Sequence, residues 1–363
     1  MTRFLLTGGS GFLAAHVLDV LLERGHSVVT TVRSVQKAEA IKEAHPTFGK
    51  DRLDFAIVED IAQPDAFDQA VISNPPFAAV IHTASPFHFN ATDMKKDFLD
   101  PGNRSSTTRG EFWDSERVLT EYYLAIIGTT GILKAIQKNA PSVERVVITS
   151  SFLAMVDRSK NFGKIYSEAD WNPITEAEAY DGQASGYRAS KTFAERAAWD
   201  FVKQENPKFT LSVCNPPLVL GPIVHYLNSL SALNTSNQRI RDLMTGAAKV
   251  SCPPTMNYFF VDVRDIALAH VLVAEKSEAG GKRFFVVSGR FSNKEIAEII
   301  GDAFPELKEK LPSGEALKPG DYPEEGTYDF DNSRSKSVLG LTYRSLRETI
   351  VDTVKSLQAV EAR

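Results

Sequence analysis

The chain has 363 residues, of which 43% are hydrophobic and 10% aromatic, enough to build a substantial core in one large domain or two smaller ones. Its net charge of −5 is spread without long runs of one sign, which excludes the basic stripe expected of a nucleic-acid or anionic-membrane partner. Glycines interrupt the first apolar stretch too early for a signal peptide or membrane span, and two cysteines are too few for a disulfide framework. We therefore expect a cytoplasmic globular protein without a metal.

The chain opens with the pattern of a strand, a glycine turn and a helix. The apolar run Arg3 to Thr7 stops at "GGSG", and apolar residues then recur with helical spacing as far as Gly25. The segment "HSVVTTVR" follows as a second buried strand. This order predicts a parallel β-α-β unit.

The glycine turn carries a dinucleotide fingerprint. Gly9-x-Gly11-x-x-Ala14 matches the usual spacing, and Gly8 offers a variant of it. Residues without side chains let the backbone approach a pyrophosphate, which lies at the positive end of the helix. We expect the cofactor on these glycines and on the first helical residues, which are Phe12 and Leu13. The alternative is an ordinary tight turn.

The end of the second strand favours NADPH over NADH. Sites for NAD place Asp or Glu there to hold the ribose hydroxyl, and an acid would repel a 2'-phosphate. This chain has Arg33 there and Lys37 within a turn of it. A guanidinium and an ammonium suit a phosphate, although both could also simply begin a solvated helix.

Two further strand candidates end in residues that suit the ligand edge of a doubly wound sheet. "LDFAIVED" ends at Asp60 and Ile61, and "AAVIHTASP" ends at Thr83 and Ala84. Ligands bind along the carboxyl edge of such a sheet, so we expect these four residues near the cofactor.

A Tyr-x-x-x-Lys pair follows a strand that ends in serines. "VERVVITSS" delivers Ser150 and Ser151, and a strong amphipathic helix begins at Tyr187, with Lys191 on the same face. We predict that Lys191 lowers the pKa of Tyr187, that Tyr187 protonates a carbonyl oxygen as hydride reaches the carbon, and that Ser151 binds that oxygen. Ser150 is the less favoured serine, and a surface Tyr-Lys pair is the alternative.

Segments in this order resemble the extended short-chain dehydrogenase/reductase superfamily, in particular the branch that contains dihydroflavonol reductase and the yeast methylglyoxal/isovaleraldehyde reductase. They include "TGGSGFLAAHVLDVLLERGHSV", "HTASPFHF", "VERVVITSSF", "YRASKTFAERAAWDF" and "NPPLVLGP". The resemblance implies a doubly wound α/β fold, NADPH as cofactor and a catalytic set of Ser151, Tyr187 and Lys191. It also implies activity on the carbonyl of small aldehydes, ketones or α-dicarbonyls.

The same resemblance implies the remaining site residues. Asp60 and Ile61 would lie near adenine. Thr83, Ala84 and the Asn215-Pro216 turn would lie beside the ribose and nicotinamide, with Pro216 in contact with the cofactor. The substrate pocket would be lined by Phe87, Phe152 and Val156.

One stretch does not fit this pattern. An excision from the second base of codon 102 through the first base of codon 125, which removes the block 103–125 and leaves one alanine codon, would join "FLDP" directly to "AIIGTTGILKA", as in relatives. Codons for the ends of the block can supply splice signals and leave the frame intact, so we hypothesise a translated, retained intron. The alternative is a genuine surface insertion, since long loops in compact domains are often functional or disordered.

The pattern of the second half of the sequence predicts a smaller lobe. We expect an NADP-binding domain over residues 1–217 and an α+β substrate lobe over 218–363, with elements near 258–290 returning to the first domain. The Asn/Ser-rich stretch 225–244 is expected to form a mobile lid. We predict a monomeric or homodimeric reductase. A nucleotide-sugar epimerase or dehydratase, or a non-catalytic NADP-binding protein, are the alternatives.

Overall fold

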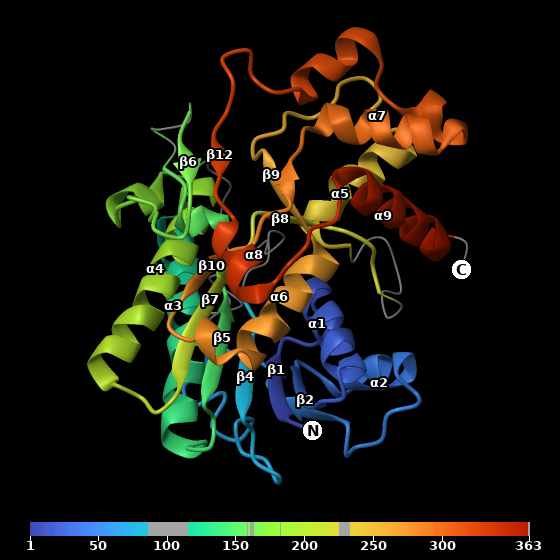
Figure 1. Cartoon of the computed structure of the whole chain (residues 1–363). Coiled ribbons are helices and arrows are strands. Elements are labelled where there is room, and N and C mark those ends of the chain that lie inside the picture. Colours follow the sequence, from blue (N-terminus) through green and yellow to red (C-terminus); the bar gives the residue numbers. More distant parts are fainter. Residues whose placement is uncertain (86–114, 158, 160–162, 182, 225–232, 362–363) are drawn as a thin grey trace, which may run out of the picture.

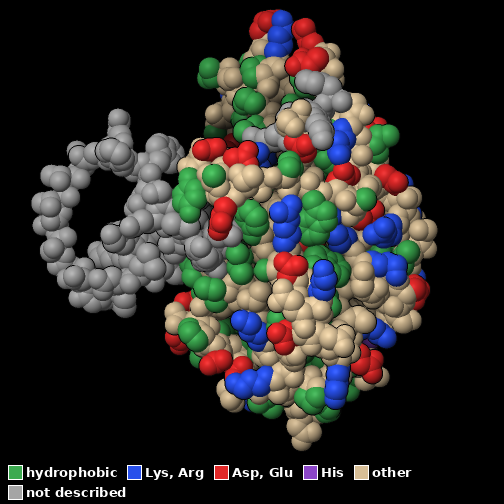
Figure 2. Space-filling model, turned by 90° about the vertical axis from the view of Figure 1, so that its left-hand side faces the viewer, with side chains coloured by type: hydrophobic (Ala, Val, Ile, Leu, Met, Phe, Trp, Pro, Cys, Tyr) green, Lys and Arg blue, Asp and Glu red, His purple; other side chains and the backbone are tan. Residues whose placement is uncertain are grey.

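The structure is a computed structural model of the chain, and it describes residues 1–85, 115–157, 159, 163–181, 183–224 and 233–361. Phe87, which the resemblance placed in the substrate pocket, lies outside these residues. On the face shown in Figure 2, basic and acidic side chains are interspersed over the described surface. No helix in the described part of the chain is both long and apolar enough to cross a membrane.

A seven-stranded parallel sheet forms the centre of the molecule (Figure 1). In chain order its strands are β1 (Arg3–Thr7), β2 (Ser27–Val32), β3 (Leu53–Ile57), β4 (Ala79–His82), β5 (Arg145–Thr149), β7 (Thr210–Asn215) and β10 (Arg283–Phe285). Their spatial order is β10-β7-β5-β4-β1-β2-β3. The chain thus moves outward from β1 to β3 and then outward the other way from β4 to β10. The crevice between β1 and β4 is where such a sheet receives its ligand.

Helices cover both faces of this sheet (Figure 1). One face packs against α1 (Phe12–Glu23), α2 (Val35–Ala44) and α6 (Val263–Glu275). The other packs against α3 (Ser115–Asn139) and α4 (Gln183–Glu205). Alternate strand residues therefore enter different apolar cores: Phe4 and Leu6 face α1, whereas Leu5 faces the α3 side. The predicted doubly wound α/β fold is confirmed.

A smaller lobe lies above the carboxyl edge of the sheet. Its three-stranded sheet contains β8 (Leu218–Leu220), β9 (Phe259–Asp262) and β11 (Gly289–Arg290). A separate apolar core joins this sheet to α5 (Thr235–Thr245), α7 (Asn293–Ala303) and α9 (Leu346–Glu361). The remaining elements are the strand pair β6 (Ile165–Tyr166) and β12 (Asp329–Phe330), helix α8 (Ser333–Leu339) and short 3₁₀ helices at Phe152–Ala154, Ala177–Tyr180, Ser277–Ala279, Pro305–Lys310 and Gly314–Gly320.

Three expectations about the elements need correction. The lid expected over 225–244 is partly a packed helix, because Ile240 and Leu243 of α5 are buried in the core of the lobe. Within 258–290, α6 and β10 return to the first domain, whereas β9 pairs with β8 in the small sheet. The helix expected to begin at Tyr187 is α4, which begins at Gln183, so Tyr187 lies one turn inside it.

The anomalous block at 103–125 is described in its second half only. Ser115 begins α3, which continues without interruption to Asn139. Ala125, the last residue of the block, is buried at 9% exposure. The retained-intron hypothesis and the domain boundary at 217/218 stay predictions.

Candidate active site

The glycine turn between β1 and α1 has no room for a side chain at Gly8 or Gly9. Gly8 has a φ of +78°, which is the left-handed region that favours glycine. A Cβ at Gly9 would overlap Thr30 Oγ1, and the Gly9 N–H donates to Thr31 O at 2.9 Å. A Cβ at Gly8 would lie 3.0 Å from the Cα of Ala84, so the turn lies directly against the end of β4.

The start of α1 suits an anion. Gly11 is the N-cap residue, and no side chain caps the helix. The first N–H groups of the helix, including those of Phe12 and Leu13, have no partner within a helix, so they can donate to a pyrophosphate. The geometry therefore fits a dinucleotide at the predicted place.

The residues that follow β2 suit a 2'-phosphate. Arg33 and Lys37 are both exposed, on either side of the start of α2, and no acid stands at the end of β2. The site can therefore hold a phosphorylated ribose, which the acid typical of NAD sites would repel.

The structure also brings the other predicted cofactor residues to this edge. Ile61 and Ala84 line one small cavity together with Lys191. Thr83 Oγ1 donates to Thr7 O at 2.6 Å, and Asp60 accepts from the Ala62 N–H at 2.9 Å.

Pro216 connects the turn after β7 to the residues that follow β5. Its carbonyl accepts from the Phe152 N–H at 2.8 Å. The residues that follow β5 are thus tied to those that follow β7.

Tyr187 and Lys191 lie on the same face of α4. The Lys191 Nζ lies 5.7 Å from the centre of the Tyr187 ring and donates to Ser85 Oγ at 3.3 Å. Burial raises the pKa of Tyr187 to about 12 and lowers that of Lys191 to about 8. The predicted fall of the Tyr187 pKa is therefore wrong here, because desolvation of the buried phenol raises it. Tyr187 remains a neutral phenol that can donate a proton.

The two serines after β5 have different surroundings. Ser150 is buried, and its hydroxyl donates to Glu195 Oε2 at 2.5 Å. Ser151 is only half-buried, and its Oγ accepts from the Leu153 N–H at 3.1 Å. Because that contact uses an oxygen lone pair and leaves the O–H available, Ser151 is the serine able to donate to a carbonyl oxygen.

A buried ion pair, which the sequence analysis missed, holds this arrangement together. Arg283 Nε donates to Glu195 Oε1 at 2.6 Å, and the two side chains are 8% and 0% exposed. Asn215 Nδ2 donates both to Glu195 Oε2 at 2.7 Å and to the carbonyl of Ser151 at 3.2 Å. Arg283 also covers the Trp171 ring at 3.9 Å. Glu195 thus ties α4 to residues at the ends of β5 and β7 and to β10.

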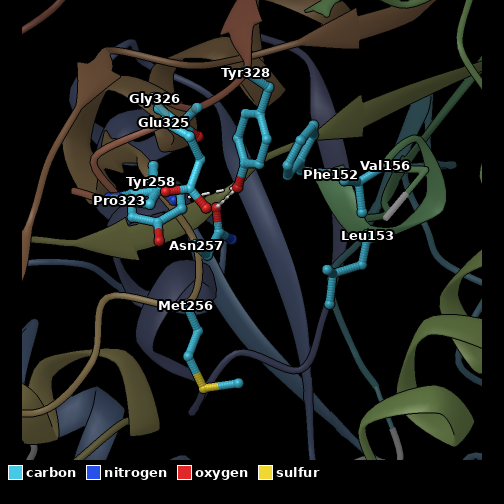
Figure 3. Close-up of a pocket in the computed structure, with 11 residues that line it drawn as sticks. Phe152, Leu153, Val156, Met256, Asn257, Tyr258, Pro323, Glu325, Gly326 and Tyr328 are labelled. Carbon is cyan, nitrogen blue, oxygen red and sulfur yellow. Dashed lines mark hydrogen bonds between the residues drawn. The ribbon is translucent and has the colours of Figure 1, made fainter. Parts of the chain in front are cut away.

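Phe152 and Leu153, which follow Ser151 in the chain, line a cavity of about 310 Å³ (Figure 3). It is lined by Phe152, Leu153, Val156, Met256, Asn257, Tyr258, Pro323, Glu325, Gly326, Thr327 and Tyr328. Figure 3 shows Phe152, Leu153 and Val156 on one side, facing the lobe residues on the other. Phe152 and Val156, which the resemblance implied for the substrate pocket, both line this cavity, and their contact with substrate stays a prediction.

Sequence signals could have identified part of what was missed. Glu195 follows Lys191 by four residues, which places it on the same face of α4. Arg283 and the lobe residues of the cavity carry no such signal, because they are distant in the chain and meet the site only in the fold. In the described part of the chain, no group of three His, Cys, Asp or Glu residues is arranged to hold a metal.

Together, the doubly wound sheet, the glycine turn and the Ser-Tyr-Lys geometry define a dinucleotide-binding protein of the short-chain dehydrogenase/reductase type. The NAD dependent epimerase/dehydratase family matches residues 4–99 and 108–288, and the chain belongs to this family.

Relatives and solved structures extend the likeness to nearly the whole chain. "Ketoreductase azaE" of Aspergillus niger is 44% identical over 98% of this chain and 97% of its own. "NADPH-dependent methylglyoxal reductase GRE2" of Saccharomyces cerevisiae is 35% identical over 99% and 98%. The crystal structure of Gre2 with NADPH from Candida albicans is 33% identical, covers 99% of both chains and has a TM-score of 0.83.

We predict that Gly9→Ala and Gly11→Ala separate folding from cofactor binding. A methyl group at Gly9 overlaps Thr30, so this variant should have a clearly lower Tm. At Gly11 the methyl group meets only Gly8 O at 3.2 Å, so the Tm should stay near that of the wild type while NADPH binding weakens. Thermal unfolding and NADPH fluorescence titration measure the two effects. Unchanged NADPH affinity in Gly11→Ala would remove the turn from the cofactor site.

We predict that Glu195→Gln lowers the free energy of unfolding by about 3–5 kcal/mol, because it leaves the buried Arg283 without its counter-charge. The matched control is Glu315→Gln, which breaks a pair with the same 2.6 Å separation but side chains that are 85% and 72% exposed. The control should cause no measurable change. Urea denaturation compares the two. A loss no larger than that of the control would show that the buried pair does not hold α4 in place.

Proposed function

We propose that Ser151, Tyr187 and Lys191 catalyse the NADPH-dependent reduction of small aldehydes, ketones or α-dicarbonyls. One observation carries the proposal. The phenol of Tyr187 and the ammonium of Lys191 share one face of α4, and the buried Glu195 ties this helix to the end of β5, where Ser151 is followed by two residues that line a cavity, Phe152 and Leu153.

The relatives confirm the predicted class of enzyme, an NADPH-dependent oxidoreductase. Proteins that match this chain almost end to end are named as a ketoreductase and as NADPH-dependent methylglyoxal reductases. Structures of such relatives were determined with NADPH. The glycine turn, the uncapped start of α1 and the basic residues after β2 fit that cofactor.

Each residue has a distinct task in the proposed mechanism. NADPH supplies the hydride when it is bound. Ser151 donates a hydrogen bond to the carbonyl oxygen and orients it. Tyr187, a neutral phenol at pH 7, gives its proton to that oxygen as negative charge develops there. Lys191 stabilises the resulting phenolate through its positive charge.

The described part of the cavity supports a small apolar carbonyl compound over a nucleotide sugar. Its lining contains no lysine or arginine among the described residues, whereas a nucleotide-sugar cleft needs basic groups for the diphosphate. The epimerase and the non-catalytic alternatives are therefore not favoured. We further propose that the enzyme works in the cytoplasm as a monomer or homodimer, as composition and resemblance imply.

We predict that Tyr187→Phe lowers kcat by about a hundred- to ten-thousand-fold while NADPH binding persists, because the variant loses only the proton donor. Tyr180→Phe is the matched control, since Tyr180 is an exposed tyrosine just before α4. NADPH oxidation with a panel of ketones, aldehydes and α-dicarbonyls measures turnover, and fluorescence titration measures binding. Retained turnover in Tyr187→Phe would contradict the assignment of the proton donor.

We predict that kcat/KM falls as the pH rises above about 8. Lys191 carries its charge below its lowered pKa of about 8 and loses it above, whereas Tyr187 keeps its proton until about pH 12. Lys191→Arg replaces the titrating group by one that stays charged, so the decline should move to higher pH even if the overall rate is lower. The pH profiles of the two proteins test this. An identical decline in both would assign it to another group.

A further inference from the structure

The lobe side of the cavity is formed by two segments that belong to no helix or strand. The first wall segment, residues 252–258, carries Met256, Asn257 and Tyr258. The second wall segment, residues 321–328, carries Pro323, Glu325, Gly326, Thr327 and Tyr328. Segments of this kind lack the regular hydrogen bonds of a helix or sheet, so contacts with other parts of the fold must hold them in place.

The start of α7 holds the first wall segment. Asn293 is the first residue of α7 and is only 2% exposed. Its Nδ2 donates to the carbonyls of Pro253 and Pro254 at 2.9 and 3.2 Å, and its backbone N–H donates to Thr255 Oγ1 at 2.7 Å. One residue thus binds the three residues that directly precede Met256.

A buried guanidinium fixes the orientation of the Asn293 amide. Arg239 Nη1 donates to Asn293 Oδ1 at 3.1 Å, and the guanidinium lies 5.6 Å from the centre of the Phe291 ring. Burial lowers the pKa of Arg239 to about 10, so the group still carries its charge at neutral pH. The reverse orientation would place the amide NH₂ against this donor and the amide oxygen against two carbonyl oxygens.

The next residues of α7 hold the second wall segment. The Tyr322 hydroxyl donates to Glu295 Oε2 at 2.7 Å, and Lys294 pairs with Asp321 at 2.6 Å. The same Glu295 oxygen accepts from the Ser292 N–H at 2.7 Å as part of a capping box. The carboxylate that binds Tyr322 is therefore itself fixed by the helix that it caps.

Thr255 connects the two wall segments to each other and to α7. Its side chain is buried, and its Oγ1 accepts from the Asn293 N–H and donates to the carbonyl of Gly320 at 2.6 Å. Gly320 directly precedes the second wall segment. The first turn of α7 is thus a common anchor for both segments.

The opposite side of the cavity belongs to the residues that follow β5. Figure 3 shows Phe152, Leu153 and Val156 across the cavity from the two wall segments. None of the described lining residues belongs to α7. The helix therefore affects the cavity only through the segments that it holds.

We propose that Asn293 and Glu295 are positioning residues, which hold the two wall segments against the part of the substrate that is remote from the reacting carbonyl. This inference rests on the proposed function, because it assigns the cavity to the same substrate. Loss of these contacts weakens transition-state binding of substrates that reach the lobe wall. Short substrates, which contact only the catalytic groups, are unaffected.

The test compares benzylacetone with butanone, which share the reacting end of the molecule and differ by one phenyl group. The quantity measured is the ratio of their kcat/KM values with NADPH. We expect the wild type to prefer benzylacetone and Asn293→Asp to lower the ratio roughly three- to tenfold, because the variant keeps the acceptor for Arg239 but loses the N–H donors. Tyr322→Phe, which keeps the ring but not the hydroxyl, should also lower the ratio.

Val354→Ala is the control for a general loss of stability. Val354 is fully buried in the lobe core on α9, so the variant should lower the Tm and leave the ratio unchanged. An equal fall of the ratio in Val354→Ala would overturn the positioning role. The same conclusion follows if the wild type shows no preference, or if neither Asn293→Asp nor Tyr322→Phe changes the ratio.

Turnover of neither compound by the wild type would instead count against the proposed function. The rise in Tm that benzylacetone causes in the presence of NADP⁺ then measures binding without turnover. A smaller rise in Asn293→Asp than in the wild type would support the positioning role, and an equal rise would overturn it.

Discussion

The buried ion pair between Glu195 and Arg283 is the interaction on which the proposed active site depends. It joins α4 to β10, and its two side chains are 8% and 0% exposed. A charge buried in this way is tolerated only with a counter-charge and a full set of hydrogen bonds. Ser150, Asn215 and Arg283 supply them to Glu195. The need to satisfy this carboxylate fixes the position of the helix that carries Tyr187 and Lys191.

A second constraint on the proposed active site is that the two lobes meet at the carboxyl edge of the central sheet. The central sheet presents its glycine turn and the residues after β5 at its carboxyl ends, and the small lobe covers that edge with segments that precede β9 and β12. The cofactor groups thus come from the sheet, whereas much of the cavity wall comes from the lobe. A division of this kind lets one set of catalytic groups serve different substrates when the lobe changes.

Local patterns predicted the first part of the fold well. The strand from Arg3 to Thr7 has the bounds that its apolar run indicated, and the fold class follows from strands and helices that alternate. Polar or irregular stretches were harder to interpret. The sequence of α5 is rich in Asn and Ser and is typical of a loop. Only its packing against α7 and α9 shows that Ile240 and Leu243 form a buried face. Tertiary packing overrides weak helix propensity in such segments.

The sequence by itself determined the chemistry of this protein: the glycine turn, the basic residues after β2, the choice of an α/β fold and the Tyr187-Lys191 pair. These features are local, since a few neighbouring residues set their geometry through the regular periods of strand and helix. Only the tertiary structure decided the surroundings of those groups. Burial raises the pKa of Tyr187 although a lysine is near it, and Glu195 binds the hydroxyl of Ser150 while the O–H of Ser151 stays available. Each of these depends on residues far apart in the chain, and desolvation and long-range hydrogen bonds exist only once the chain has folded.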